Sequence, residues 1–254
     1  MNEQRDPGRE HEGEAVGKRI RTGTAIAVLV ALGYLAVPAS PAAAAARPAP
    51  GIHANSANPD FAGYGAQGGF KTASANFVVP HIGCPKTGNY QVIPLVALGG
   101  STGGSAAGVD ARCVAGTAHY PALFIVNNAD TFVPMKISGG DKMFALVKVS
   151  TTGTVVTLKD LTHPASKTFT GPGTSITVAL IGDSNCVQGK MGCPLEQVPA
   201  FTTNAFSNVL LNGANLSQFA PTAFDMVSSG GVLQVQTSPL ATNGKGFTES
   251  FKHH

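Results

Sequence analysis

The sequence contains no tryptophan, and only 12% of its residues are charged. Without tryptophan, a core must be built from Val, Leu, Ile, Phe and Ala. Beyond residue 46 the only glutamates are Glu196 and Glu249. A mechanism with two paired carboxylates would therefore have to draw on the aspartates as well. Sequence spacing brings no such pair together, and Asp183 is expected in a turn before Cys186.

No segment shows a sustained 3.6-residue apolar period with helix caps, which argues against a helical fold. Short β-rich runs are instead separated by Gly, Pro, Asn and Asp, and one of them alternates with Met143, Ala145, Val147 and Val149 on one face. The sequence therefore predicts an all-β fold, a two-sheet antiparallel β-sandwich. The expected strands include 75–79, 91–98, 118–126, 142–150, 154–161, 175–181, 208–211 and 231–237.

Residues 1–46 have the three parts of a secretory signal peptide. Lys18, Arg19 and Arg21 precede an apolar stretch over 25–37, and an alanine run ends at Ala46. An uncleaved membrane anchor is the alternative, but about 20 apolar residues are needed to span a bilayer. We therefore expect a secreted or cell-envelope protein, a linker over 47–60, one domain over 61–254 and no membrane span after cleavage.

The charge that remains after removal of the leader is small. Twelve basic (17 − 5) and nine acidic (14 − 5) side chains are left, and the lysines are scattered singly. This pattern gives no electrostatic reason to expect a nucleic-acid partner or a membrane surface.

All four cysteines lie in the exported part, which favours two disulfides. Cys186 and Cys193 enclose a short loop with two glycines, so the expected pairs are Cys186 with Cys193 and Cys84 with Cys113. A zinc site is the alternative, but the tight C-x₂₋₄-C spacing of structural zinc is missing. No cofactor and no metal site are expected.

Gly99–Gly103 matches the G-x-S-x-G pattern of a nucleophile elbow, which requires a strand, a turn and a helix. Because another strand follows here, a glycine-serine turn is expected instead.

The histidines have no ligand partner at helical or hairpin spacing. His119 is the most interesting of them because its strand could line a cleft. Asp141 and Asp160 are expected as turn residues.

Several short motifs occur in a fixed order from residue 61 to the end of the chain: Ala62-Gly63-Tyr64, the segment Ser74 to Pro80 before Cys84, Gly108 to Cys113, Gly140-Asp141, Leu158 to Thr162, Phe206-Ser207-Asn208, and Gly244 to Thr248. In this order the chain resembles the glutamic peptidase (eqolisin) family. The resemblance implies a concanavalin-like β-sandwich and a glutamine and a glutamate that activate water.

The positions expected for this catalytic pair hold Ala106 and, at or near the place of the acid, Thr177. Alanine cannot hold a water molecule, and threonine cannot replace a carboxylate as general base. The tryptophans and other aromatic residues that line the substrate cleft in this family are also missing from the matching positions. The resemblance therefore implies a scaffold without its catalytic residues.

The sequence thus predicts a secreted, noncatalytic binding or structural protein. Gln91, Asp110 and Tyr120 are the candidates for lining a concave binding surface, and an extracellular peptide or carbohydrate is the expected partner. Two alternatives stay open. One is an active acid endopeptidase of the glutamic type with a displaced catalytic pair. The other is a glycan-cleaving enzyme on the same fold, which would need two carboxylates within about 5–10 Å of each other.

Overall fold

A computed structural model describes residues 55–186 and 197–253. Nearly all regular structure in these residues is β, and the exception is a 3₁₀ turn at Leu216–Phe219. The predicted fold class is therefore confirmed. None of the helical segments in the described ranges has the length and apolarity required to cross a membrane. The predicted signal peptide and most of the predicted linker lie outside the described residues.

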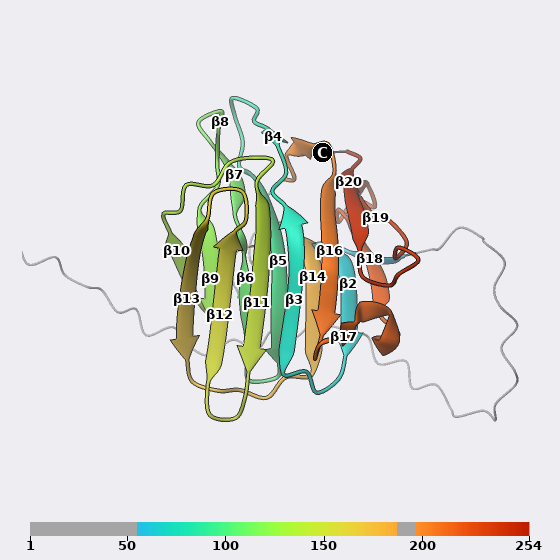
Figure 1. The fold of residues 1–254 in the computed structure, drawn as a ribbon. Helices are drawn as coiled ribbons and strands as arrows, with labels where there is room; N and C mark the ends of the chain where they lie inside the picture. Colours follow the sequence, from blue (N-terminus) through green and yellow to red (C-terminus); the bar gives the residue numbers. More distant parts are fainter. Residues whose placement is uncertain (1–54, 187–196, 254) are drawn as a thin grey trace, which may run out of the picture.

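Two antiparallel layers lie face to face (Figure 1). The first layer, called here the first sheet, runs in the order β10 (Ala129–Val133), β9 (Ala122–Val126), β6 (Gly103–Val109), β5 (Tyr90–Gly100), β14 (Val178–Ser184), β2 (Phe61–Gln67) and β18 (Thr222–Val227). The second sheet runs in the order β13 (Ala165–Gly171), β12 (Thr154–Asp160), β11 (Lys142–Val149), β3 (Thr72–Val78), β16 (Asn204–Leu211) and β20 (Phe247–Phe251).

The two sheets are joined along one side. β19 (Leu233–Thr237) pairs with β18 of the first sheet and with β20 of the second. β1 (Ser56–Asn58) pairs in parallel with β18, so part of the segment expected to be a linker is a strand. The smaller elements are β4 (Ile82–Gly83), β7 (Ala111–Val114), β8 (Thr117–His119), β15 (Ala200–Phe201) and β17 (Ala214–Asn215).

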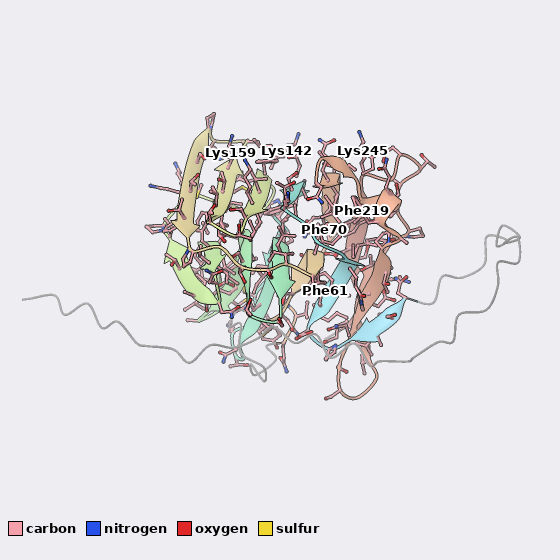
Figure 2. The ribbon with its side chains drawn as sticks, turned by 90° about the horizontal axis from the view of Figure 1, so that it is seen from below. Phe61, Phe70, Lys142, Lys159, Phe219 and Lys245 are labelled. Carbon is pink, nitrogen blue, oxygen red and sulfur yellow. A yellow bond between two sulfur atoms is a disulfide. The ribbon has the colours of Figure 1, made fainter. Side chains whose placement is uncertain are left out.

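The core lies between the two sheets, as the alternation of the sequence predicts. Met143, Ala145, Val147 and Val149 of β11 are all buried in this core. The intervening residues of β11 point outward, and Figure 2 shows Lys142 and Lys159 on the side of the second sheet that faces away from the first. Burial of one face on each strand is the main stabilising contribution in such a sandwich.

Two predicted strands and one predicted turn residue differ from the structure. The run 118–126 is interrupted between β8 and β9 at Pro121, which has no backbone N–H for the ladder. The run 175–181 is shifted, because β14 spans Val178–Ser184. Asp183 therefore lies inside a strand, whereas the sequence predicted that it would lie in a turn. The Gly99–Gly103 motif forms the turn of the β5–β6 hairpin, as the sequence predicted, with Gly100 paired to Gly103.

Candidate binding face

Ala106 belongs to a row of residues that crosses the first sheet. The row consists of residues paired directly across neighbouring strands, in the order Gly65, Leu180, Ala97, Ala106 and Ile125. Directly paired residues point to the same side of a sheet, and residues that follow each other along a strand point to opposite sides.

The next row faces the other way, into the core. It contains Tyr64, Ile181, Val96, Ala107 and Phe124, and all five belong to the cluster between the sheets. The row of Ala106 therefore points away from the core. We call this side of the first sheet its outer face.

Thr177 lies outside this row. It precedes β14, its side chain is exposed, and its backbone N–H donates to the carbonyl oxygen of Gly99. The β14 residue that shares the row with Ala106 is Leu180, with Ala97 between them. Ala106 and Leu180 have no polar side-chain atom. Neither side chain can therefore bind or deprotonate a water molecule.

The outer face is apolar beside this row as well. Ile93, Leu95 and Leu123 form a cluster separate from the main core, and Ala97 and Ile125 pack against it. No acid stands on the β14 part of the outer face, which presents Val178, Leu180, Gly182 and Ser184. The centre of this face offers shape and apolar contact and lacks acid–base groups.

Polar side chains gather at the β7 end of the outer face. Gln91 pairs with Arg112 across β5 and β7, and Arg112 pairs with His119 on β8. The Arg112 guanidinium lies 3.3 Å from the carboxylate of Asp110 and 5.2 Å from the ring centre of Phe132. The structure thus places two of the predicted binding residues, Gln91 and Asp110, at one end of the same face.

Unused hydrogen-bonding capacity remains at this end. Gln91 is 7% exposed, and its Nε2 has no hydrogen-bond partner among the residues that the structure describes. The buried Nε of Arg112 is in the same situation. Buried donors without partners are costly. The side chain of Arg112 is 41% exposed, so the rest of its guanidinium is the donor that a ligand on this face can reach.

Tyr120, the third predicted binding residue, is directed elsewhere. Its ring packs against the core clusters, and its hydroxyl accepts a hydrogen bond from the backbone N–H of Ile82 at 3.5 Å. The structure does not bring it together with Gln91 and Asp110. His119, its neighbour, is exposed on the side of Arg112.

A buried pair of acids, Asp183 and Glu249, lies inside the sandwich. Asp183 is on β14 and Glu249 on β20, and both are 0% exposed. Asn204, which is paired with Glu249, donates from its Nδ2 to Oδ1 of Asp183 at 2.7 Å. Gly63 and Gly182 leave room for the glutamate, since a Cβ on either would stand within 2.9 Å of Glu249 Oε1.

Burial raises the pKa of both acids. The pKa of Asp183 rises to about 6, and hydrogen bonds from Glu249 and Asn204 limit that rise. Burial raises the pKa of Glu249 well above its ordinary value, and the charge of Asp183 raises it further. Because Asn204 stabilises a charge on Asp183, the proton shared by the pair resides on Glu249.

This pair is out of reach of a substrate, because both carboxyls are fully buried among core residues. Sequence spacing did not reveal it, since the two residues lie on distant strands. The sequence contained one indication of this pair. In the run Val178 to Ser184, Asp183 falls on the same alternating positions as the buried Ala179 and Ile181, which predicts that it shares their buried face.

A disulfide joins Cys84 to Cys113, as predicted. It ties the segment after β4 to β7, next to the polar end of the outer face. Cys186 is also disulfide-bonded. Its predicted partner, Cys193, lies outside the described residues.

Comparison with known proteins gives a consistent result. A model of the Peptidase A4 family matches residues 59–247. A search of curated proteins finds no match. Among solved structures, scytalido-glutamic peptidase with a transition-state analogue inhibitor is 18% identical, with a TM-score of 0.64, and the match covers 76% of this chain and 98% of that one.

A second similar structure is SCP-B, described as a member of the eqolisin family in a complex with the tripeptide Ala-Ile-His. It is 18% identical, with a TM-score of 0.61, and the match again covers 76% of this chain and 98% of that one. At this identity, the structural likeness concerns the fold. The family match spans most of the chain, and the chain therefore belongs to the Peptidase A4 family, the glutamic peptidases or eqolisins.

Proposed function

We propose that this chain is an exported, noncatalytic member of its family that binds an extended peptide on the outer face of the first sheet. The observation that carries the proposal is the apolar row through Leu180, Ala97 and Ala106. A peptidase of the glutamic type needs a carboxylate and an amide around one water molecule, and this row provides neither.

The two parts of the outer face would contact different parts of a peptide. The cluster of Ile93, Leu95 and Leu123, with Ala97 and Ile125, would bury apolar side chains. Arg112, whose side chain is 41% exposed, would donate hydrogen bonds from its guanidinium to peptide carbonyl or carboxylate oxygens. The similar structures contain a peptide-based transition-state analogue and a tripeptide, which supports a peptide as the ligand.

Export of the chain rests on its leader and its cysteines. Residues 1–46 have the features of a signal peptide, and the Cys84–Cys113 disulfide suits an oxidising compartment. We therefore place the protein outside the cytoplasm, either secreted or associated with the cell envelope.

The first test is digestion of denatured casein between pH 3 and pH 6 by the purified protein without its leader. We expect the casein to remain intact after prolonged incubation. Cleavage that persists in a highly purified sample and is lost in the Glu249→Gln variant would overturn the proposal in favour of a displaced catalytic pair.

The second test measures binding of fluorescently labelled peptides by anisotropy, with a set that combines apolar residues and a free carboxylate. Arg112→Gln should weaken binding by about tenfold, the effect of one charge-assisted hydrogen bond. Lys148→Gln, which removes an exposed charge from the second sheet, is the matched control and should have no effect. Binding of polysaccharides but of no peptide would contradict the peptide assignment.

A further inference from the structure

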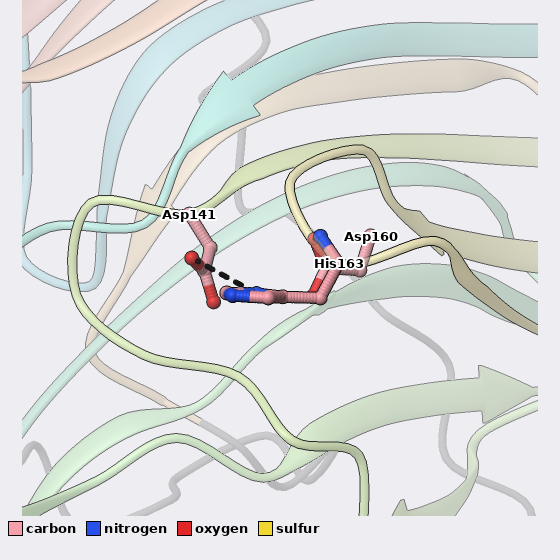
Figure 3. A group of neighbouring side chains, drawn as sticks. All are labelled: Asp141, Asp160 and His163. Atoms are coloured by element: carbon pink, nitrogen blue, oxygen red, sulfur yellow. Dashed lines mark hydrogen bonds and ion pairs between the residues drawn. The ribbon is translucent and has the colours of Figure 1, made fainter.

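Two aspartates and a histidine converge at the end of β11 and β12, away from the outer face (Figure 3). Asp141 precedes β11, Asp160 is the last residue of β12, and His163 lies in the turn that follows. One oxygen of each aspartate and one ring nitrogen of the histidine all lie within 4.8 Å of one another.

Each carboxylate is held in place through one of its oxygens. Oδ2 of Asp141 accepts the backbone N–H of Ser138 at 2.8 Å. Oδ1 of Asp160 accepts the backbone N–H groups of Thr162 and His163, both at 2.8 Å. The other oxygen of each carboxylate is then directed toward Nδ1 of His163.

The distances to that nitrogen are long for hydrogen bonds. Nδ1 of His163 is 3.5 Å from Oδ1 of Asp141 and 3.6 Å from Oδ2 of Asp160. Good N–H···O hydrogen bonds measure about 2.7–3.2 Å. Ligands of a tetrahedral zinc ion, each about 2.0–2.2 Å from the metal, are separated by about 3.3–3.6 Å. The two distances to Nδ1 therefore match the edges of a metal coordination shell, and the ligand atoms of the two aspartates lie within 4.8 Å of each other.

Charge and burial also favour a cation here. The side chains of Asp141 and Asp160 are only 7% and 1% exposed, whereas that of His163 is 58% exposed. Among the residues that the structure describes, no lysine or arginine forms an ion pair with either aspartate. Buried carboxylates are normally paired with a cation or bound to a metal.

From this geometry we propose that Asp141, Asp160 and His163 bind one divalent cation of the zinc class. Two carboxylate oxygens and an imidazole nitrogen form a donor set that suits Zn²⁺, with water as the fourth ligand on the exposed side of His163. The ion would clamp the start of β11 to the β12–β13 turn. This site is independent of the outer face and of any peptide bound there.

The experiment is isothermal titration of the chelator-treated protein with ZnCl₂ at pH 7, together with thermal unfolding. The wild-type protein should bind one zinc ion at this site and melt at a higher temperature with zinc, because a ligand of the folded state stabilises it. His163→Gln and Asp160→Asn should each weaken this binding by at least about tenfold and abolish the thermal shift.

Two controls make the outcome decisive. His119→Gln removes an exposed histidine on β8, outside the cluster, and should bind zinc like the wild type, with the terminal histidines present in both. Asp160→Asn retains Oδ1, which accepts both backbone N–H groups, so its fold should persist. Equal zinc binding by wild type and His163→Gln would overturn the proposal. So would an absence of binding, which would leave His163 as an ion-pair bridge between two aspartates.

Discussion

Two buried carboxyl groups, those of Asp183 and Glu249, make the stability of the fold depend on pH. Burial raises the pKa of both Asp183 and Glu249 in the folded protein. A group with a raised folded-state pKa stabilises the fold fully below its unfolded pKa, and this contribution disappears as the pH rises through the folded value. For this pair the stabilisation is complete below about pH 4 and declines as the pH passes 6.

We therefore predict that the wild-type protein is more stable at pH 4 than at pH 7. The shift at Asp183 alone, from 3.8 to about 6, corresponds to about 3 kcal/mol. Urea unfolding at pH 4, 5, 6 and 7 measures this difference. Glu249→Gln should make the pH profile less steep, because it removes the titrating proton of Glu249, while the contribution of the buried Asp183 remains. Asp130→Asn, at an exposed acid on β10, should keep the wild-type slope. An equally stable wild type at pH 4 and pH 7 would refute this account.

Gly182 is a second residue on which the interior depends. Its φ is +156°, and a Cβ there would overlap the carbonyl oxygen of Ala62 and lie 2.7 Å from Glu249 Oε1. Gly182→Ala should therefore destabilise the protein by at least about 2 kcal/mol. Gly69→Ala is the matched control, because a Cβ added there would have nothing within 4 Å and its φ is not positive. Urea midpoints of the two variants measure the contrast, and equal midpoints would show that the acids do not require this glycine.

At the scale of elements, the polar end of the outer face depends on short strands. β7 and β8 contain only four and three residues, and they carry Arg112 and His119. Such strands bury little surface of their own. The Cys84–Cys113 disulfide ties β7 to the segment after β4 and so holds this end in place.

We predict that Cys84→Ser with Cys113→Ser lowers the free energy of unfolding by about 3–4 kcal/mol, the value expected for a loop of this length. The bond spans 29 residues of sequence, so its loss releases considerable chain entropy in the unfolded state. Chemical denaturation at fixed pH measures the loss. Peptide binding by the folded double variant should also weaken, since Arg112 is next to Cys113. Unchanged peptide affinity of the double variant would show that the binding face does not depend on the disulfide.

At the scale of the whole molecule, the fold of the family is present, whereas in our proposal its catalytic groups are absent from the outer face. The chain matches the family model over residues 59–247, yet the outer face is apolar where Ala106 and Leu180 stand. Two polar substitutions would place a glutamine and a glutamate on either side of Ala97. They would not supply the surrounding contacts that position a substrate.

The double variant Ala106→Gln with Leu180→Glu should therefore remain far below the activity of a glutamic peptidase. Alignment of substrate and catalytic groups accounts for about 7–11 kcal/mol of a barrier, and the apolar face lacks groups evolved for it. Cleavage of casein at acid pH by the variant is the measurement, with Ala106→Gln alone as the control. Strong activity of the double variant would show that the rest of the cleft is intact.

Local patterns in the chain were sufficient to predict the fold class, the family and the Cys84–Cys113 pair. Alternation along a strand is a local property, so Met143 to Val149 predicted their buried face directly. Ordered motifs supplied the family, and the same resemblance places the family's glutamine at the position of Ala106.

Which distant residues meet depends on the three-dimensional arrangement of the strands. The register of β14 against β5 places Leu180 in the row of Ala106, and it places Asp183 in the interior with Glu249 of β20. The convergence of Asp141 and Asp160 with His163 likewise depends on how two strand ends and a turn are aligned. Register and packing arise from contacts between distant segments. A one-residue shift turns a side chain to the opposite face, and local sequence does not fix that choice.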